Sequence, residues 1–202
     1  GLPQAILVDE ANLTDLRTGI AGAIASQTLA NSDLEVATII GSGVQARYQA
    51  RCHVDLMSLN SLMIWARDHK KAEVLMDDLA DLNITIKIRN DLEALVKESQ
   101  LIITATSAKT PIIKSDWVQP GTHITAVGSD TPEKCELDPK LLAKASIVVA
   151  DSISQNKLRG EIYQALKENC LSVENLIELG EVLEGTKLGR TGPNQITVAD
   201  LT

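Results

Sequence analysis

Short apolar runs alternate along the chain with longer segments of helical periodicity. The runs are rich in Ile, Val and Leu and are bounded by polar or glycine-containing turns, as strands are. They cover residues 36–40, 62–66, 84–88, 101–106, 123–127 and 147–150. Strands that alternate with helices predict an α/β fold, with a mainly parallel, doubly wound sheet that carries helices on both faces.

The segments between these runs place apolar residues three and four positions apart, which is the spacing of one helix face. We expect the first helix to be capped by Asn12 or Thr14 and to end near residue 31. Further helices are predicted over residues 44–57, 70–79, 139–143, 160–167 and 173–179, with a short one starting at Asp91. No repeat or linker interrupts the chain, so residues 1–202 are predicted to form one domain.

Both ends of the chain have strand-like sequences. Residues 5–8 are Ala-Ile-Leu-Val, and residues 196–202 are Ile-Thr-Val-Ala-Asp-Leu-Thr. Because natural domains usually finish in polar tails, we expect this chain to be a piece cut from a longer polypeptide.

Composition excludes several classes of partner. The formal charge is 19 − 27 = −8 without a basic stripe, which argues against a nucleic-acid partner. Cys52, Cys135 and Cys170 lie too far apart for a zinc site or a disulfide framework, so we expect reduced thiols, no metal and a cytoplasmic location. The longest weakly polar stretch, residues 20–30, falls short of the ~20 residues of a membrane span, so no membrane partner is expected.

A glycine-rich segment follows the first central strand directly and opens a predicted helix. It comprises Gly41, Ser42, Gly43, Val44, Gln45 and Ala46. Glycine at the first position permits a tight turn, the second glycine lets the backbone approach a pyrophosphate, and a small third residue allows the helix to pack closely on the strand. This is the fingerprint of a Rossmann-type NAD(P)-binding domain, and a glycine turn without a ligand is the alternative.

The end of the second strand bears on the choice between NAD and NADP. An acidic residue there binds the ribose 2′-hydroxyl of NAD. This chain has Ala66 at that position, followed by Arg67 and Asp68. Arg67 can pair with a 2′-phosphate or stack on adenine, and Asp68 can cap the next helix. The sequence therefore favours NADP weakly.

The loop after the fifth strand contains Gly128, Asp130 and Lys134. Doubly wound folds place ligands and catalytic groups in such loops. An Asp and a Lys four residues apart are also typical of a turn with solvated charges, so spacing alone does not assign them a role. His53, His69 and His123 have no ligand spacing, and we expect packing or surface positions for them.

Several segments together resemble the ornithine cyclodeaminase and mu-crystallin family. The resemblance covers essentially the whole chain, and its motifs occur in family order. They are Leu13-Thr14-Asp15-x-Arg17-Thr18, the segment 41–47, the segment 127–137 with Asp130, Lys134 and Glu136, Glu161, the segment 178–182 and Gly189-Arg190. The resemblance implies a pyridine-nucleotide enzyme that acts on an amino or imino acid.

The resemblance also implies roles for individual residues. Arg17 matches an arginine that contacts the substrate carboxylate, and Asp130 matches the catalytic aspartate of the cyclodeaminases. Matches to cofactor contacts are Val44, Gln45, Thr106, Thr125, Ala126, Val127 and Lys134. Mu-crystallin-like members lack the aspartate, so Asp130 favours a cyclodeaminase. Ala66 and Arg67 depart from the ornithine enzyme, which has an aspartate at that strand end.

The implied reaction is an ammonia-lyase reaction that converts ornithine to proline through an imine, with internal transfer and return of a hydride. Alternatives within the family are an NAD(P)H-dependent ketimine reductase, an alanine dehydrogenase and an ectoine-utilisation relative. A non-catalytic binding protein of the mu-crystallin type is a further alternative.

The resemblance implies in addition that most of a substrate and dimerisation domain lies outside this chain, and that residues 1–31 and 190–202 border it. We therefore expect the full-length protein to be a homodimer and this chain alone to be inactive.

Overall fold

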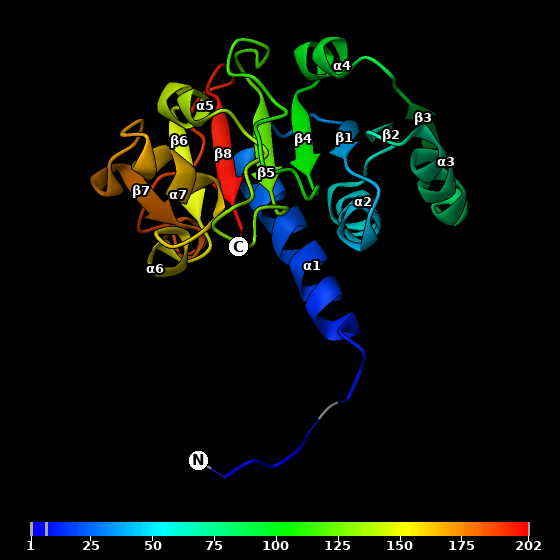
Figure 1. The fold of residues 1–202 in the computed structure, drawn as a ribbon, viewed down its shortest axis with the longest axis horizontal. Coiled ribbons are helices and arrows are strands. Elements are labelled where there is room, and N and C mark those ends of the chain that lie inside the picture. The colour runs from blue at the N-terminus through cyan, green and yellow to red at the C-terminus, as the bar shows by residue number, and fades with distance from the viewer. Residues whose placement is uncertain (1, 7, 202) are drawn as a thin grey trace.

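The computed structural model describes residues 2–6 and 8–201, and one sheet forms their centre (Figure 1). Its strands are β1 (Val36–Ile40), β2 (Ser61–Trp65), β3 (Thr85–Ile88), β4 (Leu101–Thr104), β5 (His123–Ala126), β6 (Ile147–Ala150), β7 (Leu176–Glu178) and β8 (Thr197–Asp200). The order across the sheet is β3-β2-β1-β4-β5-β8-β6-β7, and every pairing of neighbours is parallel. The predicted Rossmann-type, doubly wound fold is confirmed.

Helices cover both faces of the sheet because neighbouring residues of each strand point in opposite directions. Ile39 packs with α2 and α3, whereas Ile40 packs in the cluster that includes α4, α5 and α7. The helices are α1 (Asn12–Leu29), α2 (Val44–Met57), α3 (His69–Asp78), α4 (Leu92–Glu98), α5 (Pro139–Lys144), α6 (Ile153–Asn156), α7 (Gly160–Lys167) and α8 (Leu179–Leu183). In the part of the chain that is described, no helix is long and apolar enough to cross a bilayer.

The chain reverses its direction of travel across the sheet between β1 and β4. After β1 it moves outward through β2 and β3, and it then returns to place β4 and β5 on the other side of β1. The loops that follow β1 and β4 therefore diverge and leave a crevice at the carboxyl ends of the strands. Such a switch point is where doubly wound folds bind ligands.

Three local predictions are wrong. Residues 5, 6 and 8 form no strand, because no neighbouring segment offers them backbone partners; Leu7 lies outside the described residues. Residues 173–179 form a 3₁₀ turn (Val173–Asn175) and strand β7, because this apolar run pairs with β6 at the sheet edge. At the start of α1 the N-cap is Ala11, and the Asp9 carboxylate accepts the N–H of Leu13 at 2.5 Å.

Candidate functional site

A cleft of about 490 Å³ opens at the switch point. The loops after β1, β2, β4 and β5 form its walls. Its lining residues are Gly41, Ser42, Gly43, Val44, Gln45, Trp65, Ala66, Arg67, Asp68, Lys71, Ala105, Thr106, Ser107, Ala108, Ile112, Val127, Gly128, Asp130 and Lys134. Most of the residues predicted from the sequence to contact a cofactor therefore meet in one cleft.

The glycine loop has the geometry that its sequence predicts. Gly41 has a φ of 137°, and a Cβ there would collide with the carbonyl oxygen of Ala105, so only glycine fits. A Cβ on Gly43 would meet no atom within 4 Å. Gly43 is the N-cap of α2, and no side chain caps this helix end. Backbone N–H groups of the first turn of α2 are consequently free to bind an anion.

Two cations line the cleft where β2 ends. Arg67 follows the strand, and Lys71 lies one turn further on, in α3. Among the described residues, neither forms an ion pair with a carboxylate. Asp68 lies between them and caps α3 by accepting the N–H of Lys70 at 3.1 Å, as predicted. This end of the cleft therefore offers two unpaired positive charges.

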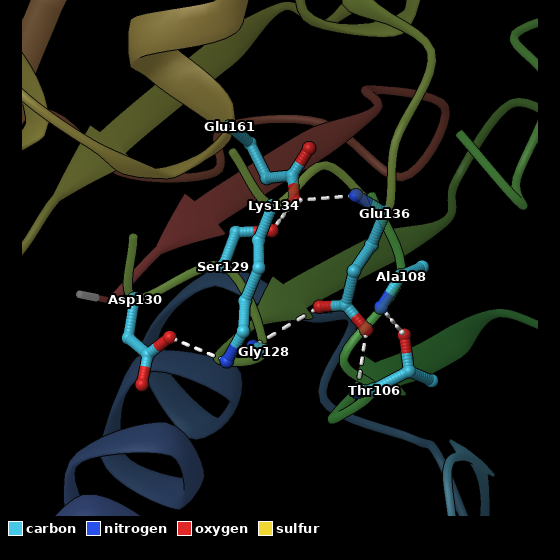
Figure 2. Close-up of polar contacts among 8 residues, drawn as sticks. All are labelled: Thr106, Ala108, Gly128, Ser129, Asp130, Lys134, Glu136 and Glu161. Carbon is cyan, nitrogen blue, oxygen red and sulfur yellow. Dashed lines mark hydrogen bonds and ion pairs between the residues drawn. The ribbon is translucent and has the colours of Figure 1, made fainter. Parts of the chain in front are cut away.

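The opposite end of the cleft is formed by the segments after β4 and β5. Thr106, Gly128, Asp130 and Lys134 lie there together (Figure 2). The Nζ atom of Lys134 is 2.5 Å from Oδ1 of Asp130. The Asp130 side chain is 61% exposed, so its carboxylate is accessible from the cleft and from solvent.

Behind this wall lies a buried carboxylate, that of Glu136. Its Oε1 accepts the N–H of Thr106 at 2.6 Å, and its Oε2 accepts the N–H of Gly128 at 3.0 Å (Figure 2). Oε2 also accepts the hydroxyl of Thr104 at 2.8 Å. Glu136 thus joins the segment that follows β4 to the segment that follows β5. Glu136 lies in one of the segments that resemble the family, and no role was predicted for it from the sequence.

A second buried carboxylate supports the first. Glu161, in α7, accepts the hydroxyl of Ser129 and the N–H groups of Glu136 and Leu137, the last two at 2.8 and 3.0 Å. Burial, together with the charge of Glu161, raises the pKa of Glu136 to about 7. Burial also raises the pKa of Glu161 and that of Asp200, which accepts the N–H of Ile162 at 2.8 Å. We call Glu136, Glu161 and Asp200 the carboxylate network.

A different polar network lies beneath α1. It is a line of hydrogen bonds from the carbonyl of Gln49 through His53, Ser26, Thr125, His123 and Thr197 to the carbonyl of Leu29, with separations of 2.7 to 2.9 Å. All five side chains are fully buried. Burial lowers the pKa of His53 to about 4 and that of His123 to about 3. We call this line the imidazole network.

Three predicted site residues lie elsewhere. The side chain of Thr125 belongs to the imidazole network, and neither Thr125 nor Ala126 lines the cleft. Arg17 is exposed on α1 and does not line the cleft either. Conversely, Lys71 was not predicted, although its place four residues after Arg67 could have indicated it.

The segments that build this cleft are those that carried the family resemblance. A model of the "Ornithine cyclodeaminase/mu-crystallin family" matches residues 1–202. The chain belongs to this family. A protein from Sinorhizobium fredii, described as an uncharacterized cyclodeaminase, is 42% identical over 204 residues, which cover all of this chain and 62% of that protein. The chain thus spans about three fifths of the length of such a relative.

Solved structures of family members share this fold. The complex of Thermococcus litoralis Δ1-pyrroline-2-carboxylate reductase with NADH and L-proline superposes with a TM-score of 0.90 at 30% identity, covering 95% of this chain and 60% of that one. A dimeric archaeal alanine dehydrogenase with bound NAD superposes with a TM-score of 0.86 at 33% identity, with the same coverage of both chains. The predicted family is therefore confirmed, and its members include dehydrogenases, reductases and cyclodeaminases.

Proposed function

We propose that the cleft binds a pyridine dinucleotide. The glycine loop and the free N–H groups of α2 would hold the pyrophosphate, because they offer donors and an open approach at Gly43. The adenosine half would then lie toward β2, and the nicotinamide half toward Thr106 and Gly128, on the other side of the switch point. The similar structures that contain NADH and NAD support the binding of a pyridine dinucleotide.

We propose NADP rather than NAD as the preferred cofactor. Arg67 and Lys71 place two unpaired cations at the adenosine end, where a 2′-phosphate would lie, and Ala66 provides no carboxylate for a 2′-hydroxyl. Arg67→Ala should therefore weaken NADP binding roughly 10- to 100-fold and leave NAD binding nearly unaltered.

Calorimetric titration with both cofactors tests this preference. Lys70→Ala is the matched control, because Lys70 neighbours Lys71 in α3 but does not line the cleft. Equal losses of NAD and NADP affinity in Arg67→Ala would instead indicate stacking on adenine.

For the whole protein we propose the conversion of ornithine to proline and ammonia. The observation that carries this proposal is the accessible carboxylate of Asp130 at the nicotinamide end of the cleft. It accepts a hydrogen bond from the ammonium group of Lys134, which is the same chemical group as the δ-ammonium of ornithine. Asp130 would hold this ammonium and remove its proton, since an amine attacks only when neutral. The bound dinucleotide supplies reversible hydride transfer at Cα of the substrate.

A product assay on the whole protein tests this reaction. Supplied with ornithine and catalytic NAD(P), it should form proline and ammonia, and Asp130→Asn should abolish both, because an amide cannot accept the proton. Glu133→Gln is the matched control, because Glu133 lies in the same loop but outside the cleft lining. Proline formation by Asp130→Asn at the unaltered rate would overturn the role of Asp130.

A second candidate is a dehydrogenase or imine reductase of the same family. Its support is the similarity to an alanine dehydrogenase and to a pyrroline-2-carboxylate reductase. Oxidation of alanine with NAD(P), or reduction of a cyclic ketimine with NAD(P)H, without proline formation from ornithine, would favour this candidate. Binding of small molecules without any turnover would favour the non-catalytic, mu-crystallin-like alternative.

We propose further that the substrate site needs protein outside this chain. Arg17, the proposed partner of the substrate carboxylate, is exposed, and an exposed ion pair contributes only ~0 to 1 kcal/mol. Without a second wall, the gain from orienting the substrate is lost. The chain alone should thus bind the cofactor without turnover, and the whole protein is proposed to be a homodimer. Proline formation by these 202 residues at a rate near that of the whole protein would overturn this division.

A further inference from the structure

The position of Glu136 suggests a role beyond support of the loops. All three donors that its carboxylate accepts come from the ends of β4 and β5, and two of them, the N–H groups of Thr106 and Gly128, belong to residues that line the cleft. Glu136 itself is fully buried. Its charge therefore lies directly behind the wall that would face the nicotinamide.

At Gly128, the wall between Glu136 and the cleft is formed by backbone without a side chain. A Cβ on Gly128 would collide with Oε2 of Glu136 and with the carbonyl oxygen of Thr106. Only backbone atoms of Gly128 fit at this point. No side chain is therefore interposed there to screen the carboxylate from a ring bound in the cleft.

The carboxylate also has no cationic partner. Among the described residues, no lysine or arginine forms an ion pair with Glu136. The titratable and charged groups around it are Glu161 from α7, the buried thiol of Cys135 and, in the same loop, the ion pair of Lys134 with Asp130. Lys134 is thus already paired with Asp130, and the buried titratable group of α7 beside Glu136 is a second acid, Glu161.

We propose that Glu136 is a positioning residue for the Thr106 and Gly128 wall, and that its carboxylate makes the cleft bind the oxidised nicotinamide in preference to the reduced form. This inference rests on the proposed binding of a dinucleotide in the cleft. The oxidised ring carries a positive charge and the reduced ring does not. A buried carboxylate that lacks a counter-charge attracts the former much more strongly than an exposed one would, because little water screens it.

The experiment compares two forms of one cofactor. Dissociation constants of NADP⁺ and NADPH are measured at pH 6 and pH 8, and their ratio is followed, because ionisation of the phosphates is common to both forms and cancels. Since the pKa of Glu136 is about 7, its charge changes within this interval. The preference for NADP⁺ over NADPH should rise roughly fivefold or more from pH 6 to pH 8.

Two variants separate charge from architecture. Glu136→Gln keeps the shape and an acceptor oxygen but not the charge, and its ratio should stay constant with pH. Asp200→Asn is the matched control. It removes an equally buried acid that bonds to Ile162 rather than to the cleft wall, and its ratio should follow that of the unaltered protein.

A measurement on the unaltered protein keeps the inference testable if Glu136→Gln does not fold. Near pH 7, calorimetry in two buffers of different ionisation enthalpy should detect more proton release on binding NADP⁺ than on binding NADPH. Equal proton release, or a ratio that does not change with pH while both forms bind, would overturn the role of Glu136 and leave the cofactor cleft standing. If neither form binds, the proposed function fails, and this inference fails with it.

Discussion

The carboxylate network and the imidazole network are both fully buried, yet burial shifts the pKa values of their groups in opposite directions. The carboxylate network lies on the face of the sheet that carries α7, and two of its members hold the segments around the cleft. The imidazole network lies on the face that carries α1 and joins this helix to α2, β5 and β8. Burial raises the pKa values of the acids and lowers those of the imidazoles, so both networks resist ionisation.

A count of hydrogens shows what distinguishes them. The imidazole network has six contacts in line and ends at a carbonyl on each side. Two neutral imidazoles and three hydroxyls supply only five hydrogens, so one contact is left without a hydrogen. The carboxylate network has donors for its oxygens but lacks a positive charge. Protonation of an imidazole would supply the missing hydrogen, but burial opposes the charge, so the first network stays neutral. The second network, whose acids have no cationic partner among the described residues, is suited to respond to a charge in the cleft.

One of the two largest expected effects is the loss of folding stability at acid pH that protonation of the imidazole network causes. For a group whose folded pKa lies below its unfolded value, stability is complete above the unfolded pKa and is lost as the pH falls. The contribution of neutral His53 to folding stability should be lost as the pH falls from 6.5 to about 4. His53→Gln should therefore lose less stability over this range than the unaltered protein, by roughly 3 kcal/mol. Urea unfolding at pH 6.5 and pH 4 measures the difference, and parallel losses in the two proteins would contradict it.

The carboxylate network should show the opposite slope. The folded pKa of Glu136, about 7, lies above its ordinary value of 4.5, so the unaltered protein should lose stability as the pH rises through this interval. Glu136→Gln should gain roughly 3 kcal/mol relative to the unaltered protein between pH 4.5 and pH 7, since the pKa shift is as large as that of His53. The same unfolding measurements apply. If the free energy of unfolding changed with pH equally in the variant and in the unaltered protein, the two networks would not have pH dependences of opposite sign.

A third variant touches neither network. A Cβ on Gly43 meets no protein atom within 4 Å but would project where the pyrophosphate is proposed to approach. Gly43→Ala should weaken dinucleotide binding at least tenfold, which corresponds to about 1.4 kcal/mol, without lowering the midpoint of unfolding. Calorimetry and thermal unfolding measure the two quantities. Unchanged affinity would contradict the proposed pyrophosphate site, and this conclusion would not depend on the role of Glu136.

The smallest effect is expected for the charged pair at the rim of the cleft. Lys134 and Asp130 are partly exposed, and such pairs contribute ~0 to 1 kcal/mol to stability. Lys134→Ala should shift the free energy of unfolding by less than about 1 kcal/mol at neutral pH. A loss of unfolding free energy as large as that expected for the buried networks would show that solvent exposure does not explain the difference between this ion pair and the buried groups.

The sequence predicted the parts of this molecule that depend on local pattern. Strands such as residues 36–40 are apolar on both faces, and the glycine loop is defined by the backbone space that Gly41 and Gly43 need. Predictions failed where a partner distant in sequence decides. The residues after Val173 are apolar enough for a helix or a strand, and pairing with β6 selects the strand.

The same reason explains what was missed at the site. Nothing local to Glu136 indicates that its donors come from residues 104, 106 and 128, since the fold alone brings these together. Thr125 was expected to contact a cofactor, but its neighbours on α1 and β5 engage its hydroxyl.

The position of β8 has a consequence for the order in which this fold can assemble. In chain order β8 follows all seven other described strands, yet it lies between β5 and β6. During synthesis, the five strands from β3 to β5 and the pair β6 and β7 are complete before the strand that joins them exists. Two open strand edges, on β5 and β6, therefore face water until residues 197–200 arrive, and such edges are where nascent chains associate wrongly.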